Sequence, residues 1–205
     1  MTTASGSPTK PDKLRLAYLM ITTPVPNTYV GGMMVTDGRG LPVEFRYTEP
    51  IQPTKIQQVL YGQVLSSYIK QEVILETLIK GLETKFNCLL VGDEALMIST
   101  VAGAPAIRIT ETQSPSLGEV GEVQEVSPSE VLLQITREAP PLRLNLPENP
   151  ADAKALPDNS AQTSATPPPY AMLVDAGKTM DIYEPMKRIE KALEIICQEE
   201  GIRKS

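Results

Sequence analysis

The stretch "GGMMVTDGRGLPVEFRYTEPIQPTKIQQVLYG", residues 31–62, carries the clearest pattern in the chain and predicts a β-hairpin that leads into a helix. The letters "DGRG", Asp37 to Gly40, form a strong turn signal between two runs typical of strands. After this turn, apolar and polar residues alternate from 43 to 48, which is the period of a half-buried strand. Two prolines in "EPIQPTK" end that strand, and Thr54 is the expected N-cap of the helix.

The helical pattern runs from Thr54 to about Glu83 and predicts one long helix. Apolar residues recur every three or four positions, beginning with Ile56, Leu60 and Val64, and this spacing predicts an apolar face along the helix. Gly62 lies inside the pattern. It is compatible with a kink, with a close contact to the sheet, or with a break after a short first helix.

Further strands are expected on both sides of this region. They are predicted at 14–25, 28–37, 86–91, 104–111, 130–136 and 170–177. A C-terminal helix follows, with Asp181 as its expected N-cap and Pro185 in its first turn. Its apolar stripe fits either a core-facing side or a surface that docks on a partner. The order of elements predicts an α+β fold: a mainly antiparallel sheet with a long helix and a C-terminal helix packed on it.

Composition divides the chain into four parts. Residues 1–13 are polar and proline-containing, and we expect a flexible lead. Residues 14–138 form the α+β domain, with an acidic loop at about 111–130. Residues 139–169 are rich in proline and alanine and are expected to form a linker. Residues 170–205 are expected to complete the same domain with a strand and a helix.

Charge and residue content favour some partners over others. The formal net charge is −6, and clustered cations are scarce, so a nucleic-acid partner is not expected. The chain has no histidine, which removes imidazole chemistry and histidine-ligated zinc. No apolar run is long enough to cross a membrane, so a cytoplasmic protein without a membrane contact is expected. Cys88 and Cys197 are expected to be buried free thiols, and no cofactor is expected.

Candidate binding residues are carboxylates near predicted strand ends and the arginines beside them: Asp37, Glu44, Arg46, Glu49 and Arg108. Asp93 and Glu94 are the candidates for a Mg²⁺ or Ca²⁺ site, since both ions prefer oxygen ligands. Glu44 and Arg46 share one strand face. They form either a surface ion pair of little energy or a polar recognition face beside the start of the helix.

The segments "VTDGRGLPVEFRYTEPIQPTKIQQVLYG" (35–62) and "LLVGDEALM" (89–97) resemble those of a family of uncharacterised bacterial proteins. The resemblance covers about residues 28–110 and implies no activity and no functional residue. The order of a hairpin, a helix and an antiparallel sheet also resembles roadblock- or longin-like regulatory domains at the level of fold.

No catalytic motif with a characteristic spacing is present in the sequence. The leading hypothesis is therefore a non-enzymatic interaction or regulatory module that contacts another protein or a second copy of itself. The alternative is a small carboxylate-based, Mg²⁺-dependent enzyme or ligand-binding domain. That alternative uses Asp37, Glu44, Arg46, Asp93 and Glu94.

Overall fold

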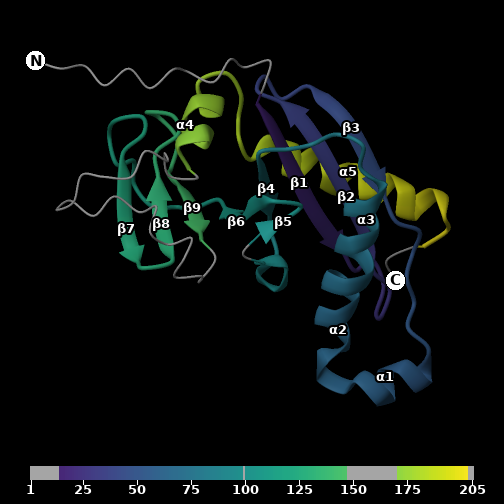
Figure 1. The fold of residues 1–205 in the computed structure, drawn as a ribbon. Coiled ribbons are helices and arrows are strands. Elements are labelled where there is room, and N and C mark those ends of the chain that lie inside the picture. Colours follow the sequence, from purple (N-terminus) through teal and green to yellow (C-terminus); the bar gives the residue numbers. More distant parts are fainter. Residues whose placement is uncertain (1–13, 99, 147–169, 203–205) are drawn as a thin grey trace, which may run out of the picture.

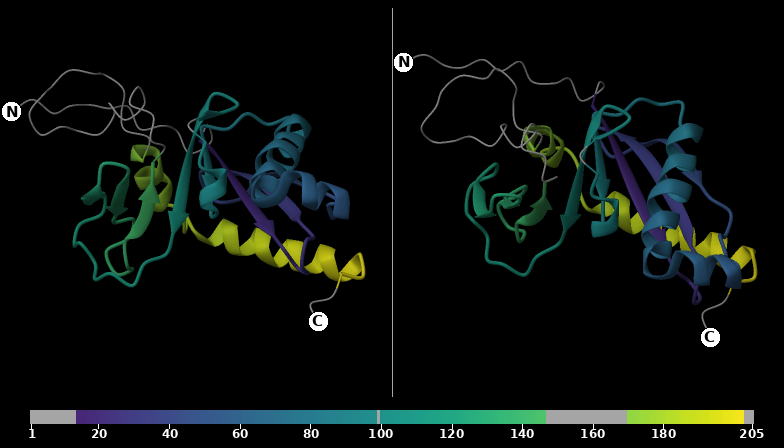
Figure 2. Two further views of the ribbon diagram at one scale, coloured as in Figure 1. Left: turned by 90° about the horizontal axis from the view of Figure 1, so that it is seen from below. Right: turned by 60° about the horizontal axis from the view of Figure 1, so that its bottom comes forward.

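The computed structural model describes residues 14–98, 100–146 and 170–202 (Figure 1). Nine strands occur in this part of the chain and join one mixed sheet. The order across the sheet is β3-β2-β1-β4-β6-β9-β8-β7, and β5 (Thr100–Val101) pairs with β6 outside this path. Helices lie on both faces of the sheet, so the fold has three layers over most of its width (Figure 2).

The centre of the sheet is parallel. Strand β4 (Cys88–Val91) pairs in parallel with β1 (Arg15–Thr22) on one side and with β6 (Ala104–Thr110) on the other. The expectation of a mainly antiparallel sheet is therefore wrong. The four residues of β4 are apolar and buried without alternation, which suits a parallel strand but does not decide its direction, since β2 is equally buried and pairs antiparallel. Strands that are covered on both faces, as parallel strands are, carry continuous apolar runs of this kind.

The expected hairpin is present as β2 (Val30–Asp37) and β3 (Pro42–Tyr47), which pair antiparallel across a bulge at Val35 and Thr36. Strand β2 also pairs antiparallel with β1. Gly31 and Gly32 in β2 mark close approaches of the helices on the two faces. A Cβ atom on Gly31 would lie 2.2 Å from Ile74 Cγ2, and one on Gly32 would lie 3.0 Å from Leu193 Cδ2.

The helical segment after β3 is broken. It consists of α1 (Lys55–Tyr61), a 3-10 turn η1 (Gly62–Val64), α2 (Leu65–Tyr68), a π-helical segment η2 (Ile69–Leu75) and α3 (Glu76–Gly81). Thr54 is the N-cap of α1, as the sequence predicted, and together with Gln57 it forms a capping box. The prediction of a single long helix is wrong, because Gly62 adopts a φ of 52° and ends α1.

This break separates two kinds of helical surface. From Leu65 onward the helical layer packs on the sheet through Ile69, Ile74, Leu75 and Leu78, which are buried against β1, β2 and β4. By contrast, α1 buries no residue at all. The apolar periodicity therefore continues through a helix that does not touch the sheet.

The opposite face is covered by α4 (Ala171–Gly177) and α5 (Glu184–Glu199), as Figure 2 shows for the long α5. The strand predicted at 170–177 is wrong, since α4 is a helix. Its buried residues, Tyr170, Leu173, Ala176 and Gly177, follow a helical spacing. The stripe of α5 faces the core, with Met186, Ile189 and Leu193 buried. The N-cap is Tyr183, so the expectation of Asp181 is wrong by two positions, although Asp181 Oδ1 accepts hydrogen bonds from the Tyr183 and Glu184 amides.

Strands β7 (Val123–Ser127), β8 (Glu130–Leu133) and β9 (Leu142–Asn145) complete the sheet. Strand β7 falls within the expected acidic loop, and β9 falls within the expected linker. The expected flexible lead, the rest of the linker from 147, and residues 203–205 lie outside the described residues. No helix in the described ranges is long and apolar enough to cross a membrane.

Candidate functional site

Several candidate residues meet at the carboxyl ends of the parallel strands. Asp93 and Glu94 follow β4 directly, and Arg108 lies opposite Val91 in the β4–β6 register. In open sheets with parallel strands, ligands commonly bind beyond the carboxyl ends, where the connecting loops leave polar groups available. This edge is therefore the strongest candidate for a functional site in the described part of the chain.

Asp93 is held by the helical layer. Lys70 Nζ in η2 donates to Asp93 Oδ2 at 2.5 Å, and the Ala95 amide donates to Asp93 Oδ1 at 2.9 Å. Burial raises the pKa of Asp93, but the hydrogen bonds from Lys70 and Ala95 outweigh burial and lower the pKa below its usual value. Gln71 Nε2 also donates to the Ala95 carbonyl oxygen. The sequence analysis missed Lys70 and Gln71, because they lie more than twenty positions from Asp93 and belong to no motif.

Arg108 in β6, Asn145 in β9 and Glu130 in β8 form a row of hydrogen-bonded polar side chains across three strands. Arg108 Nε donates to the Gly92 carbonyl at 3.2 Å, and its guanidinium lies 3.9 Å from the Glu94 carboxylate. Next to it, Asn145 in β9 accepts a hydrogen bond from Arg108 and donates one to Glu130 in β8. We use the name carboxyl-edge cluster for Lys70, Gln71, Asp93, Glu94, Arg108 and Asn145. The cluster combines two carboxylates and two cations at one edge of the sheet.

Glu44 and Arg46 form a separate group on β3. Arg46 Nε donates to Glu44 Oε1 at 2.9 Å, and the Glu83 and Thr84 amides also donate to the Glu44 carboxylate. Burial raises the pKa of Glu44, but hydrogen bonds from Thr84, Glu83 and Arg46 lower it to about 2. Glu44 therefore ties β3 to the loop that enters β4, and its carboxylate oxygens are already engaged.

The Glu44 carboxylate is expected to make stability depend on pH. Its pKa is about 2 in the folded chain, against an ordinary value of 4.5. The stabilisation is therefore complete above pH 4.5 and is lost as pH falls toward 2. At pH 7, Glu44→Gln should lower the free energy of unfolding by roughly 1–2 kcal/mol, allowing for solvent screening. Urea unfolding at several pH values measures this. A difference from the wild type that stays constant down to pH 2 would contradict this role for the carboxylate.

Asp37 and Glu49 lie elsewhere. Asp37 ends β2 opposite Arg15 at the start of β1, so it occupies the opposite edge of the sheet from Asp93. Its carboxylate accepts hydrogen bonds from the Arg39 and Leu41 amides and holds the hairpin turn. Glu49 is exposed on the loop after β3. The structure therefore brings together Asp93, Glu94 and Arg108 but not the other candidates.

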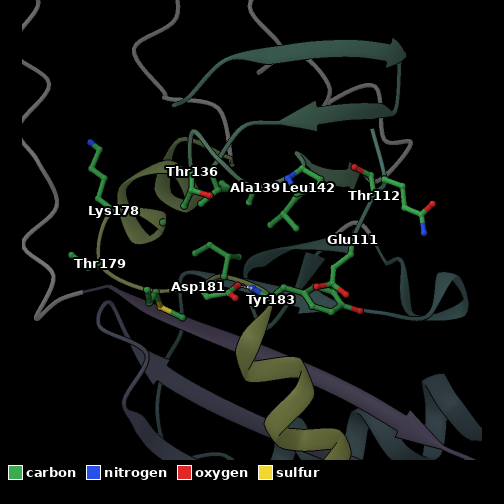
Figure 3. Close-up of a pocket in the computed structure, with 15 residues that line it drawn as sticks. Glu111, Thr112, Thr136, Ala139, Leu142, Lys178, Thr179, Asp181 and Tyr183 are labelled. Atoms are coloured by element: carbon green, nitrogen blue, oxygen red, sulfur yellow. Dashed lines mark hydrogen bonds between the residues drawn. The ribbon is translucent and has the colours of Figure 1, made fainter. Parts of the chain in front are cut away.

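A cavity of about 660 Å³ lies between the end of β6, β9 and the connection from α4 to α5 (Figure 3). None of the candidate residues lines it. Its charged side chains already have partners, since Glu111 pairs with Lys187 and Lys178 pairs with Asp175. Asp181, also on its wall, caps α5. The cavity is therefore separate from the group formed by Asp93, Glu94 and Arg108.

No group of three or more potential metal ligands occurs within residues 14–98, 100–146 and 170–202. Asp93 and Glu94 nevertheless fit one kind of site. Mg²⁺ is usually bound by only one or two carboxylates together with waters and substrate phosphates. The neighbouring residues are therefore compatible with a Mg²⁺ ion that is shared with a ligand.

No protein-family model and no curated protein sequence matches the chain. Solved structures do match. Human endonuclease V matches with a TM-score of 0.57 at 12% identity, over 92% of this chain and 84% of that protein. The Streptomyces avermitilis endonuclease V matches with a TM-score of 0.55 at 11% identity, over 93% and 84%. The chain has the endonuclease V fold.

A third endonuclease V, from Ciona intestinalis, was solved in complex with a 23mer DNA that contains an inosine. It matches with a TM-score of 0.50 at 9% identity, over 89% of this chain and 86% of that one. At such identities the likeness establishes the fold and leaves the activity of this chain to be proposed.

These structures correct several expectations. The likeness to roadblock or longin domains is wrong, since the matching fold is that of endonuclease V, and no family model supports the bacterial resemblance. The hypothesis of a non-enzymatic protein-interaction module is overturned by the same finding. The exclusion of nucleic acid is also wrong, because a protein of this fold binds DNA. That exclusion relied on the net charge of the whole chain, which averages over surfaces of different local charge.

Proposed function

We propose that this chain binds nucleic acid at the carboxyl-edge cluster. The observation that carries the proposal is the meeting of Lys70 and Arg108 with two carboxylates at the carboxyl ends of β4 and β6. An endonuclease V of the same fold is known in complex with DNA, which supports this choice of ligand. Phosphate contacts by lysine and arginine supply most of the affinity in such complexes.

The two cations keep donors for a ligand. An ammonium group has three N–H donors, and Lys70 uses one on Asp93. Arg108 has five donors, of which the structure pairs Nε with Gly92 and one terminal nitrogen with Asn145 and Glu94. Both side chains are partly exposed. A phosphate can therefore approach them without first breaking the bonds that hold the cluster.

The local charge around the cluster also differs from the net charge. Lys55 and Lys70 are the only charged side chains between residues 55 and 71, and Glu72 and Glu76 follow them in η2 and α3. Five glutamates lie between 111 and 130, on and around β7 and β8. Much of the net charge of −6 therefore lies on the segment 111–130, whereas in the cluster Lys70 and Arg108 balance Asp93 and Glu94.

A salt titration tests the proposal. Binding of a fluorescein-labelled oligonucleotide should weaken as salt rises, and the plot of log K against log salt should be linear. Lys70→Gln should reduce the slope by about 0.7–0.9, the value of one phosphate contact. Lys80→Gln is the matched control, because Lys80 is exposed near the far end of the helical layer and pairs with Glu76. Wild-type protein that shows no salt-dependent binding would overturn the proposal.

A second candidate function is Mg²⁺-dependent hydrolysis of a phosphodiester at the same place. The observation that favours it is the pair of adjacent carboxylates, Asp93 and Glu94, with the pKa of Asp93 lowered so that it stays ionised. A bound Mg²⁺ would polarise a phosphoryl oxygen and lower the pKa of a bound water. Lys70 would orient Asp93, and Arg108 would contact a phosphate.

A cytoplasmic location belongs to the same proposal and is consistent with the two free buried cysteines.

A further inference from the structure

The surface of α1 and η1 is unusual in this molecule. Four aliphatic side chains, Ile56, Val59, Leu60 and Val64, are between 63% and 81% exposed. Helix α1 has seven residues and buries none of them. A helix this short has little stability of its own in water, so it gains most from a ligand that covers it. Exposed apolar patches of this kind commonly mark binding surfaces.

Two tyrosines extend this surface. Tyr61 ends α1 and Tyr68 ends α2, and their ring centroids are 4.7 Å apart at an interplanar angle of 36°. Both rings are more than one-third exposed. We use the name α1 ridge for Ile56, Val59, Leu60, Tyr61, Val64 and Tyr68. Exposed aromatic rings beside a positive surface are what proteins use to stack unpaired bases.

The α1 ridge precedes two residues of the carboxyl-edge cluster, Lys70 and Gln71, in the sequence. Tyr68 is two residues before Lys70 and three before Gln71, which bind Asp93 and the Ala95 carbonyl. In Figure 1, α2 continues the helical column of α3 downward, and α1 lies across the lower end of this column. A strand whose phosphates contact Lys70 therefore has the ridge within reach of its bases.

The ridge itself carries no charge and has a lysine at each end, an arrangement that suits a ligand with both anionic and apolar groups; Glu72 and Glu76 lie beyond Tyr68. From 56 to 69 no side chain is charged, and Lys55 and Lys70 flank the ridge at its two ends. Phosphates on the two lysines would place the bases between them on uncharged rings and aliphatic groups.

We propose that the α1 ridge binds the unpaired bases of single-stranded nucleic acid. The inference rests on the proposed function, because Lys70 belongs to both surfaces. It adds the class of ligand: a strand with exposed bases, in preference to a duplex whose bases are stacked and paired.

The test compares two ligands of one sequence, a labelled single strand of about 20 nucleotides and its duplex. The double variant Tyr61→Ala/Tyr68→Ala should bind the single strand at least about ten-fold more weakly. Its affinity for the duplex should change by less than about two-fold. The variant Tyr61→Phe/Tyr68→Phe keeps both rings and should bind the single strand as the wild type does. Tyr47→Ala is the matched control, because Tyr47 is an exposed tyrosine on β3.

The outcomes separate the two proposals. Wild-type protein without salt-dependent binding of either ligand overturns the proposed function. Salt-dependent binding that the double alanine variant leaves intact overturns the ridge alone. An equal loss for single strand and duplex also overturns it, since stacking on unpaired bases predicts a selective loss. Light scattering gives the last check: a wild-type dimer that the alanine variant dissociates would show that a second copy covers the ridge.

Discussion

Replacement of Gly31 by valine is expected to cost about 3 kcal/mol of folding free energy or more, at the upper end of the overpacking range. A Cβ at this position would lie 2.2 Å from Ile74 Cγ2 and 3.3 Å from Leu78 Cδ1. Ile74 is fully buried, and as a β-branched residue in a helical segment it has one strongly preferred rotamer. Neither side chain can move away easily, so β2 and η2 must separate. Such a loss is a large share of the roughly 5–15 kcal/mol that stabilises a typical domain.

Urea unfolding measures the Gly31 effect. Gly81→Val is the control, because a Cβ at Gly81 meets nothing within 4 Å. The free energy of unfolding of this variant should differ from that of the wild type by less than about 0.5 kcal/mol. Adding Ile74→Ala to Gly31→Val should recover part of the loss, because the two positions share the same space. If Gly31→Val unfolds at the wild-type urea midpoint, the close packing of η2 on β2 is incorrect.

Asp93→Asn is expected to lower Mg²⁺-dependent cleavage of nucleic acid by at least about 100-fold, if the second candidate function holds, since a metal ion contributes several kcal/mol to such a reaction. The substitution keeps the size of the side chain and an oxygen that can accept from the Ala95 amide. It removes the negative charge that Lys70 and a cation would share. In the wild type, Mg²⁺ should raise the melting temperature by mass action, and this rise should disappear in the variant.

Glu119→Gln serves as the control for Asp93, because Glu119 is an exposed carboxylate that pairs only with Arg137 among the described contacts. It should leave both the cleavage rate and the Mg²⁺-induced melting shift unchanged. A melting shift that persists in Asp93→Asn would place any metal elsewhere in the chain. Cleavage without Mg²⁺ would contradict the role that the second candidate function gives to Asp93 and Glu94.

Local patterns predicted the local structure well. The "DGRG" turn and the Thr54 N-cap are present as predicted, and the α5 stripe takes the core-facing one of its two open interpretations. Gly62 was also a sound signal, since the break it causes was one of the readings left open. These features depend on neighbours within a few positions of the chain. Short-range chemistry is enough to specify them.

Strand direction and the site depended on distant contacts. The direction of β4 relative to β1 is decided by the chain that connects them, which passes through the helical layer. More than 60 residues separate the two strands in the sequence. The continuous apolar run "CLLV" was the one signal that favoured a parallel strand. Lys70 reaches Asp93 only because this crossover lays η2 over the end of β4. A pattern-based reading therefore identified Asp93, Glu94 and Arg108 but not the residue that joins them to the helices.

The most direct test of the central claim is photo-crosslinking of the wild-type protein to a single strand that carries 4-thiothymidine, followed by trypsin and mass spectrometry. The cleavage sites place the α1 ridge in the peptide 56–70, and the carboxyl end of β4 with Asp93, Glu94 and Arg108 in the peptide 86–108. The account predicts adducts on these two peptides, and fewer adducts as salt rises. Adducts confined to the acidic peptide 109–137 or to α5 would contradict it, because nucleic acid would then bind a different surface of the fold.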